Sequence, residues 1–543
     1  MPASFTIVNL KDIMRAFKKA GSGCSMSKQL AKSTSVVAGM TMISRIFGFT
    51  RDMVTAQFFG AGVAFDAFSI AFKIPNFMRR LFAEGSFSQA FVPVLANYQK
   101  NQSEAAIKSF LGAMMGTLGV VLLVVTVLGI VLAPWLVRVF APGFATTGAR
   151  YDLAVIMLRI TFPYLMLISL AAFSGAILNT YSRFWVAAFT PVFLNICMIG
   201  ATIWLAPQFH VPIIALAISV SIGGIVQLLF QFPFLKKINL LPCPRVDFKD
   251  PGVRNVLKLM VPALFGVSVS QINLLLDTLF ASFLIVGSVS WLYYSDRLME
   301  FPLGVFGVAI STVILPHLSR HHASNAARDF SLTLDWALRC ILLLGFPATV
   351  GLIVISGPLL STLFQHGKFD GHAVVMAQKS LRMFALGIVP FMVIKILAAG
   401  FYAKQNMRTP VMIGVIAMLA NMLFNLALIW PLAHAGIALA TSLAAFVNMG
   451  FLYYFLRQKH IYLPQAGWAY FSFRLVIANS ILAVWLWLAS GDLQWWLASQ
   501  WWERLGHLTF LLLSAGIIYL AGLWIVGVRP RDLFMMQSEV VVE

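Results

Sequence analysis

Long apolar stretches without charge recur along this chain, and they constrain its fold more than any other feature. The clearest, LGAMMGTLGVVLLVVTVLGIVLAP (111–134), contains no charged side chain. A stretch of about 20 apolar residues can cross a bilayer as one helix, which satisfies its backbone hydrogen bonds internally. Because 60% of the 543 residues are hydrophobic and only 11% are charged, a soluble fold is excluded. The sequence predicts an all-α polytopic membrane protein with about fourteen transmembrane helices.

Basic residues gather in alternate loops between the apolar stretches. Residues 236–258, after the sixth predicted span, contain six Lys or Arg residues, whereas the loop 206–212 before that span contains none. Such an excess is typical of cytoplasmic loops, so both termini are predicted to be cytoplasmic if the chain has fourteen spans. The basic residues 1–32 then form a cytoplasmic arm, which either lies on anionic lipid or stays a disordered tail. The net charge of +20 thus reflects membrane orientation and does not indicate nucleic acid.

Motifs for catalysis or metal binding are missing from the sequence. The four cysteines lie far apart, without the spacing of a metal site or a disulfide framework. The sequence contains no Walker A, HExxH or GxSxG motif. We therefore predict a transporter and not an enzyme, with no metal centre and no cofactor. Its expected driving force is the membrane potential, with Na⁺ as a further candidate.

The chain repeats itself at a constant offset. The tetrapeptide IALA occurs at 214–217 and again at 437–440, and the Ser and Pro of SQAFVPVL (88–95) recur with the same separation in STVILPHL (311–318). Two same-direction repeats of six spans are related by an axis along the membrane normal, with the substrate site between them. We therefore expect the first two spans to face the seventh and eighth across a central cavity.

The repeat also divides the chain into segments. The last two predicted spans lie outside it and form an appendage. In order, the predicted segments are the basic cytoplasmic arm 1–32, the N-terminal six-helix half 33–240, the cytoplasmic linker 241–257, the C-terminal six-helix half 258–460, and the two extra helices with the C-terminal tail 461–543.

Four arginines lie in or beside the apolar stretches. An arginine at the bilayer centre costs about 2.5–3.5 kcal/mol on insertion scales, so a chain that keeps several of them uses them. Clustered guanidinium groups in a low-dielectric cavity bind phosphate through paired hydrogen bonds. The same groups argue against a cationic cargo. The residues predicted to bind an anionic, phosphorylated substrate are Arg45, Arg51, Arg79 and Arg297.

Acidic and basic side chains accompany these arginines at helical spacing. Arg45 and Asp52 are seven residues apart, so they share a helix face. Charged side chains of this kind have three interpretations. They are neutralised ion pairs that hold helices together, or side chains near helix ends whose charges reach the lipid headgroups. Alternatively, they pair across the two halves in one state and separate in the other. The last interpretation makes them a gate beside the cavity. The candidates are Asp52, Asp66, Lys73, Glu84, Asp296 and Glu300.

Three further polar residues lie deep in predicted spans. Asp277 is in the seventh span, and Asn421 and Asn425 are one helical turn apart in the eleventh. Their oxygens have the chemistry of a Na⁺ site. Hydrogen bonding between helices is the simpler explanation of the two asparagines. Both interpretations stay open at this point.

Several long motifs resemble the MurJ (MviN) family. The similarity runs from about residue 33 to beyond residue 460, and more weakly to the C-terminus. The motifs are MTMISRIFGFTRD (40–52), FGAGVAFDAFSIAFKIPNFMRRLFAEGSFSQAFVPVL (59–95), GVSVSQINLLLDTLFASFL (266–284) and SVSWLYYSDRLMEFPLGVFGVAISTVILP (288–316).

The resemblance implies the multidrug/oligosaccharidyl-lipid/polysaccharide exporter fold. It implies flipping of lipid II, the undecaprenyl-diphosphate-linked peptidoglycan precursor, from the cytoplasmic to the periplasmic leaflet for cell-wall synthesis. It matches the four arginines to the cavity arginines of the family, and Asp66, Ser290 and Glu300 to positions of its gate or cavity. It also implies a hydrophobic groove, formed with the last two spans, for part of the polyprenyl tail. At the Na⁺ site of some members, this chain has Asn425 where an acid is expected.

The expected location is the bacterial cytoplasmic (inner) membrane, with many passes. The expected partners are lipid II, membrane lipids and the cell-wall synthesis machinery. Two other classes stay open: a flippase or exporter of another polyprenyl-linked glycan or a drug, and a membrane scaffold that transports nothing. A scaffold tolerates alanine at Arg45 and Arg297, whereas a phosphate-binding transporter does not.

Overall fold

The computed structural model describes residues 28–81, 87–146, 148–324 and 326–529, and the regular elements within them are all helices. Ten of these helical segments are long and apolar enough to cross a membrane. The predicted all-α polytopic architecture is confirmed, whereas the count of fourteen spans stays a prediction. Most of the predicted basic arm (1–27) and the gate candidate Glu84 lie outside the described residues.

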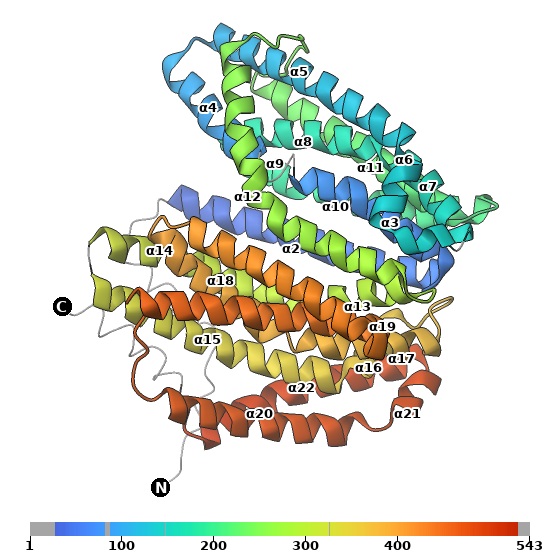
Figure 1. Cartoon of the computed structure of the whole chain (residues 1–543), viewed down its shortest axis with the longest axis vertical. Coiled ribbons are helices and arrows are strands. Elements are labelled where there is room, and N and C mark those ends of the chain that lie inside the picture. The colour runs from blue at the N-terminus through green and yellow to red at the C-terminus, as the bar shows by residue number, and fades with distance from the viewer. Residues whose placement is uncertain (1–27, 82–86, 147, 325, 530–543) are drawn as a thin grey trace.

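The N-terminal half forms a bundle, drawn in blue to green in Figure 1. Helix α5 begins where the Ser103 side chain accepts a hydrogen bond from the Ala106 amide at 3.3 Å, an N-cap that replaces a missing helical bond. Helix α3 continues through Pro75 to Arg79. The helices are α2 (Lys28–Phe59), α3 (Val63–Arg79), α4 (Ser88–Asn101), α5 (Glu104–Val131), α6 (Ala133–Phe140), α7 (Ala149–Thr161), α8 (Pro163–Thr180), α9 (Phe184–Phe189), α10 (Pro191–Gly200) and α11 (Ile213–Lys237).

The C-terminal half forms a second bundle. A π-helical turn (Leu303–Gly307) joins α13 to α14, and the longest helix, α19, is bent at Ala433, which has φ 49° and ψ −128°. The helices are α12 (Pro251–Ser282), α13 (Ser288–Pro302), α14 (Val308–Ala323), α15 (Ala327–Val354), α16 (Ser356–Phe364), α17 (Gly371–Ala385), α18 (Ile388–Ala403) and α19 (Arg408–Gln458).

Helix α12 belongs to both bundles. Its first turns pack against α4 and α5, where Val253 and Val256 are fully buried beside Phe110. Its later turns pack along α19 of the C-terminal half, and Figure 1 shows it crossing from one bundle to the other. The segment before it lies on α5, because the Arg245 amide donates to the Gly112 carbonyl at 3.0 Å. Helix α12 begins at Pro251, within the stretch 241–257 that was predicted as the linker.

The chain ends in an appendage of three helices, drawn in red in Figure 1. Helices α20 and α22 pack against each other, with α20 against α15 and α22 against α16. A separate cluster of buried apolar side chains, which includes Leu482, Trp496 and Leu511, holds them together. The helices are α20 (Trp468–Ser490), α21 (Leu493–Ala498) and α22 (Trp501–Ile525).

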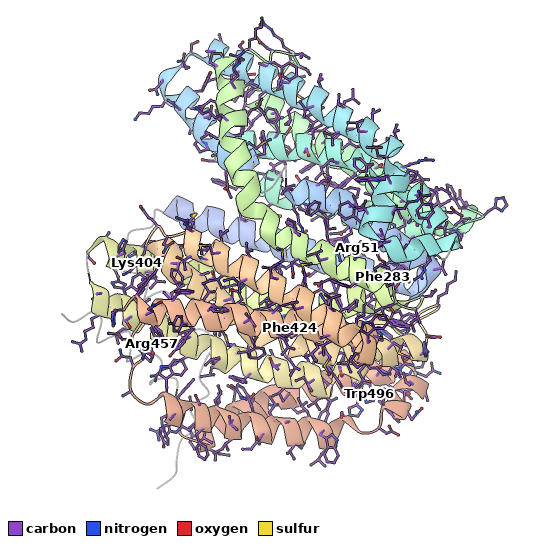
Figure 2. All side chains as sticks on the ribbon, viewed as in Figure 1. Arg51, Phe283, Lys404, Phe424, Arg457 and Trp496 are labelled. Carbon is purple, nitrogen blue, oxygen red and sulfur yellow. The ribbon has the colours of Figure 1, made fainter. Side chains whose placement is uncertain are left out.

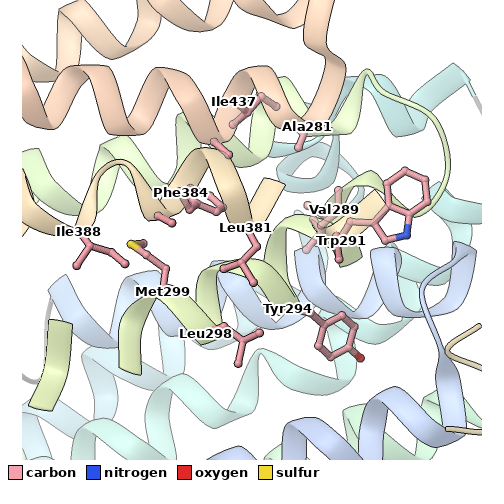
Figure 3. Packing of buried hydrophobic residues seen from close by; sticks show 14 of the residues in the cluster. Ala281, Val289, Trp291, Tyr294, Leu298, Met299, Leu381, Phe384, Ile388 and Ile437 are labelled. Atoms are coloured by element: carbon pink, nitrogen blue, oxygen red, sulfur yellow. The ribbon is translucent and has the colours of Figure 1, made fainter. Parts of the chain in front are cut away.

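The two halves meet at one end and diverge at the other. In Figure 1 they lie together where α3, α7 and α13 are labelled, which we call the closed end, and apart where α4 and α14 are labelled, which we call the open end. The main hydrophobic core crosses between the halves, with the Phe65 ring of α3 stacked on the Tyr294 ring of α13 at 5.1 Å. Figure 3 shows Tyr294 and its neighbours Leu298 and Leu381 in this core. The predicted meeting of the second span with the eighth is therefore present.

Candidate functional site

A charged cavity of about 170 Å³ lies between the halves, walled by α3 on one side and by α12 and α13 on the other. Three of the charged groups in its lining are basic and three are acidic. The predicted excess of positive charge is therefore not in the lining itself. These groups are Lys73, Arg80, Asp277, Asp296, Arg297 and Glu300.

A buried carboxylate beside this cavity joins the two halves. Asp52 of α2, which is 2% exposed, pairs with its neighbour Arg51 at 2.6 Å and with Arg297 of α13 at 3.5 Å. The Tyr293 hydroxyl of α13 donates to the same carboxylate at 2.8 Å. Arg51 also donates to the Asn195 side chain at 3.0 Å. Two of the four predicted arginines thus share one carboxylate across the interface.

Arg297 is the member of the four whose side chain lines the cavity. Its Nη1 pairs with Glu300 at 2.9 Å, one turn along α13, and its guanidinium lies 4.9 Å from the centre of the Tyr293 ring. The side chain is 31% exposed. An anion that enters the cavity can therefore reach the guanidinium and replace a carboxylate on it.

The other two predicted arginines lie outside the cavity lining. Arg45 is on the exposed side of α2, with its guanidinium over Gly304, where an added Cβ would lie 2.0 Å from Nη1. Arg79 ends α3 and donates from Nε to Asn76 at 2.8 Å. Its neighbour Arg80 lines the cavity in its place.

Lys73 reaches from α3 across the cavity to the other half. Its Nζ donates to the Thr278 hydroxyl of α12. It shares the lining with Asp296 of α13 and Asp277 of α12. This contact places a cation from the N-terminal half among carboxylates of the C-terminal half.

Asp277 and the two asparagines do meet. The Asp277 carboxylate accepts from Asn421 at 2.7 Å, from Asn425 at 2.9 Å and from the Thr441 hydroxyl at 3.3 Å. These bonds are the interhelical hydrogen bonding that was the simpler expectation. Both asparagine Oδ1 atoms are buried and accept no hydrogen bond from a described residue. Two unpaired oxygens beside a carboxylate also suit a hard cation, so the donor set fits both interpretations.

At the closed end, Asp66 fastens α3 to the start of α13. Its carboxylate accepts from the Gly287 amide at 2.7 Å, from the Ser290 amide at 2.9 Å and from the Ser290 hydroxyl at 2.5 Å. Arg150 of α7 pairs with it at 3.8 Å. A carboxylate at a helix N-terminus accepts hydrogen bonds from the free amides of the first turn, and its negative charge interacts favourably with the positive end of the helix dipole. Asp66 and Ser290 therefore lie together, as expected of a gate, two helical turns away from Lys73.

Two glycines form a second contact at the closed end. Gly60 follows α2 with φ +66°, and Gly367 precedes α17 with φ +57°. A Cβ on Gly60 would lie 2.4 Å from the Lys368 carbonyl oxygen, and a Cβ on Gly367 would lie 2.4 Å from the Gln57 carbonyl oxygen. The Lys368 amide donates to that same Gln57 oxygen at 2.9 Å. Only glycine allows the two backbones to approach so closely with positive φ.

The sequence did not single out Tyr293, Thr278 or Arg150. Tyr293 precedes Arg297 by four residues, so helical spacing alone placed it beside a residue already under consideration. Thr278 carries no charge and follows Asp277 directly, which gave no signal. Arg150 lies outside the strongly apolar stretches, and its contact with Asp66 depends on how α7 packs against α3.

A second, larger cavity of about 740 Å³ lies between α20 and the α15, α18 and α19 helices. Its lining is almost wholly apolar. Of the last two predicted spans only α20 contributes to it, and none of its lining residues also lines the charged cavity. The predicted tail groove that uses both last spans stays a prediction.

Comparison with known proteins gives the family. The family model described as "Lipid II flippase MurJ" matches residues 55–505. The probable lipid II flippase MurJ of Haemophilus influenzae is 47% identical over 507 residues, which cover 91% of this chain and 99% of that protein. The lipid II flippase MurJ of Burkholderia cenocepacia is 41% identical, covering 92% of this chain and 98% of that protein.

Solved structures agree with the sequence comparison. A lipid II flippase MurJ in an inward closed conformation matches with a TM-score of 0.76 and 27% identity, covering 92% of this chain and 99% of that one. An inward-facing multidrug resistance MATE transporter of the MOP superfamily matches with a TM-score of 0.64 at 12% identity, over 78% of this chain and 98% of that one, which shows a shared fold alone. Because the family model covers most of its length and both named relatives match nearly all of it, this chain belongs to the MurJ family of lipid II flippases.

Proposed function

We propose that this chain moves lipid II from the cytoplasmic to the periplasmic leaflet of a bacterial inner membrane by alternating access. Its family is named for this activity. The observation that carries the proposal for this chain is the position of Arg297. Its guanidinium is partly exposed in a cavity between the halves, and its carboxylate partners, Asp52 and Glu300, come from both halves.

The diphosphate of the substrate takes the place of these carboxylates. Phosphate oxygens accept paired hydrogen bonds from a guanidinium, as carboxylates do, and a diphosphate brings more negative charge. Lys73 and Arg80 line the same cavity from the N-terminal half. A bound diphosphate therefore draws basic groups of both halves toward itself while it releases Asp52 from Arg297. Substrate binding is in this way linked to the contact between the halves.

Release on the other side requires the closed end to separate. The bonds between Asp66 and the first turn of α13, and the glycine contact of Gly60 with Gly367, join the halves there. Both must break for the cavity to open at that end, while the diverging helices of the open end come together. Polar bonds to a helix N-terminus can break and form again, and the stacked rings of Phe65 and Tyr294 must separate with them; a change between two such packings suits a gate with two states.

The open end is proposed to face the cytoplasm. Figure 2 shows Lys404 and Arg457 at the end of the molecule where α14 lies. These residues belong to the basic loops between predicted spans, and basic loops favour the cytoplasmic side. Both termini are then cytoplasmic, provided that the number of spans is even. The cell-wall synthesis machinery, which uses lipid II on the periplasmic side, is the expected partner.

The membrane potential is the proposed driving force. An inside-negative potential favours the export of an anion by about 2.3 kcal/mol per charge per 100 mV if the charge crosses the whole field. Asp277, Asn421, Asn425 and Thr441 would hold Na⁺ if that ion is coupled. A bound cation there would offset the buried carboxylate of Asp277.

Periplasmic exposure of lipid II tests the proposal. Cells that depend on this chain alone would carry wild type, Arg297→Ala, Arg297→Lys or the control Arg183→Ala, which changes an exposed loop arginine. We expect exposure to collapse and unflipped precursor to accumulate in Arg297→Ala, to recover in part in Arg297→Lys, and to stay normal in Arg183→Ala at matched protein levels. Normal exposure in Arg297→Ala would make this arginine structural and overturn the mechanism. Purified chain in vesicles with another polyprenyl-diphosphate glycan tests the alternative cargo.

A further inference from the structure

The end of helix α12 rests on the N-terminal half at the closed end. The contact is made by the short 3₁₀ helix between α6 and α7, η2 (Pro142–Thr146). Helix α12 packs against both α6 and η2, and Figure 2 shows Phe283, the residue that follows α12, at the closed end. This contact is separate from the bonds of Asp66, which go to the start of α13.

Gly143 of η2 allows two backbones to approach closely at this contact. Its amide donates to the Ser282 hydroxyl of α12 at 3.1 Å, and both residues are buried. A Cβ on Gly143 would lie 2.3 Å from the Ser282 carbonyl oxygen and 2.6 Å from the Phe283 Cα. These are backbone atoms, which cannot turn aside as the end of a flexible side chain can. A larger residue at position 143 is therefore incompatible with the contact as it stands.

A buried guanidinium holds the same end of α12. Arg150, in the first turn of α7, is 4% exposed and donates to the Leu284 carbonyl at 3.4 Å. Leu284 lies two residues beyond the last residue of α12, where the helix dipole favours a cation. The pair of Arg150 with Asp66 lies within the N-terminal half. Helices α3 and α7 pack against each other there, and the Thr161 hydroxyl donates to the Ala71 carbonyl at 2.9 Å. The bond to Leu284, in contrast, crosses between the halves.

We propose that Gly143, Ser282 and Arg150 form a seat for the end of α12, and that this seat is a second part of the gate at the closed end. Asp66 holds the start of α13 and the seat holds the end of α12, so the turn between the two helices is fixed at both of its ends. The seat rests on the alternating access proposed above, because that motion must separate this turn from α3 and α7. Both contacts must break before the turn can leave.

Thiol labelling of the full chain tests the seat. Opening is measured as the rate at which a thiol reagent labels Ser288→Cys, a buried position in the first turn of α13, in a chain without its native cysteines. Gly143→Ala should raise this rate at least about fivefold, because the added methyl group is overpacked only while the end of α12 is seated. The φ of Gly143 is not positive, so alanine suits the backbone of the N-terminal half itself. Gly62→Ala is the matched control: Gly62 has an extended backbone before α3, and its Cβ would meet no atom within 4 Å.

The other side of the seat offers a variant that adds no bulk. Ser282→Ala removes the acceptor of the Gly143 amide and should raise the labelling rate about fivefold, the effect of one hydrogen bond. The change also removes the bond from the Ser282 hydroxyl to the Leu279 carbonyl within α12. The control is therefore Ser319→Ala, an exposed change on α14 that removes the same kind of bond, to the Leu315 carbonyl.

Labelling of Ser174→Cys, a buried position on α8, separates opening of the gate from loosening of the N-terminal half. We expect it to stay slow in every variant. An unchanged rate at Ser288→Cys in Gly143→Ala or in Ser282→Ala would overturn the seat, and so would an equal rise at Ser174→Cys. Flipping of lipid II is measured separately in the same variants. Faster opening in a chain that does not flip lipid II would leave the seat standing and overturn only the proposed function.

Discussion

Buried charges lie both between the two halves and between the appendage and the C-terminal half. The two interfaces differ in how these charges are paired and in how far they are exposed. Between the halves, one carboxylate, Asp52, serves both Arg51 and Arg297, and the Arg297 side chain stays 31% exposed to a cavity. Each of these groups has an alternative partner within reach, such as Glu300 for Arg297. Such an interface can exchange its ion pairs without burying an unpaired charge.

At one end of the appendage interface, the charges are enclosed. Asp335 of α15 is 1% exposed and pairs with Arg339 at 2.9 Å. It also accepts from the Tyr462 hydroxyl and the Trp468 indole, each at 2.7 Å. Burial, together with this carboxylate, raises the pKa of Tyr462, which keeps the hydroxyl a donor. Arg339 in turn donates to the Ala466 carbonyl at 3.1 Å and lies over the Trp468 ring.

At the other end of the same interface, a guanidinium binds only carbonyl and amide oxygens among the described residues. Arg504 of α22 is 7% exposed. It donates to the Ser499 carbonyl at 2.8 Å, to the Ser361 carbonyl at 3.1 Å and to the Gln365 side chain at 2.9 Å. These oxygens lie in or just after the last turns of α21 and α16, where helix dipoles favour a cation. The two clamps fix the appendage to the C-terminal half at both ends.

The difference separates a movable interface from a fixed one. Ion pairs with shared partners can rearrange, whereas an enclosed, buried network loses several bonds at once when it opens. We therefore expect substitutions in the appendage clamps to lower stability, and substitutions between the halves to change transport with little effect on stability.

The largest expected effect is that of Asp335→Ala. It leaves Arg339 as a buried, uncompensated charge, which typically costs about 3–5 kcal/mol. Thermal unfolding of the purified full chain in mild detergent measures it. The matched control is Asp247→Ala, which removes a surface pair with Arg245 at 3.7 Å and should cost less than about 1 kcal/mol. Equal unfolding temperatures for the two variants would show that the clamp is no stronger than a surface pair.

Arg504→Ala should have the next largest effect. It removes hydrogen bonds from a charged donor and leaves buried carbonyls unpaired, at a cost of about 2–3 kcal/mol. Arg504→Lys keeps the charge but not the several donors, so its unfolding temperature should lie between those of Arg504→Ala and wild type. The folded fraction of each variant should still flip lipid II at the wild-type rate. A lower rate per folded molecule would mean that the appendage moves during transport.

Asp66→Asn should shift the closed end without unfolding the chain. The amide keeps one acceptor oxygen but loses the second, together with the negative charge that faces Arg150, so at least one hydrogen bond of about 1.4 kcal/mol is removed, which is at least a tenfold change in the population of the open gate. The rate of thiol labelling at Ser288→Cys, a buried position at the closed end, measures the opening in a chain without its native cysteines. Asp152→Asn, an exposed change on α7, is the control. An unchanged labelling rate in Asp66→Asn would show that Asp66 has no role in opening the closed end.

Much of the fold could be predicted from the sequence because a bilayer permits few solutions. Apolar stretches required helices, and the internal repeat indicated that α3 would meet α13. Pairs within one helix also followed from spacing, as Arg297 and Glu300 do at 2.9 Å. The helix through Pro75 keeps Asp66 and Lys73 on one element, as their seven-residue spacing required.

The exact partners at the site could not be predicted, because they depend on how the halves meet. Spacing favoured Asp52 as the partner of Arg45, yet it pairs with Arg51 and with Arg297 of the other half. The apolar surroundings of Arg79 and the family resemblance favoured that arginine for the cavity, whereas the adjacent Arg80 lines it. A helix advances about 100° per residue, so a difference of one position in a predicted face decides which arginine faces the cavity.

The smallest expected effect is that of Tyr293→Phe, and it tests the movable interface most directly. The change removes a hydroxyl that donates to Asp52 at 2.8 Å, while the ring that lies against the Arg297 guanidinium remains. Because Asp52 keeps its contacts with Arg51 and Arg297, the loss should be that of one ordinary hydrogen bond, about 1 kcal/mol, so flipping should change by about fivefold, with an unfolding temperature close to that of wild type. Tyr402→Phe, an exposed change on α18, is the control. A large loss of stability in Tyr293→Phe would place this residue with the clamps of the appendage, and the distinction between a movable and a fixed interface would not hold.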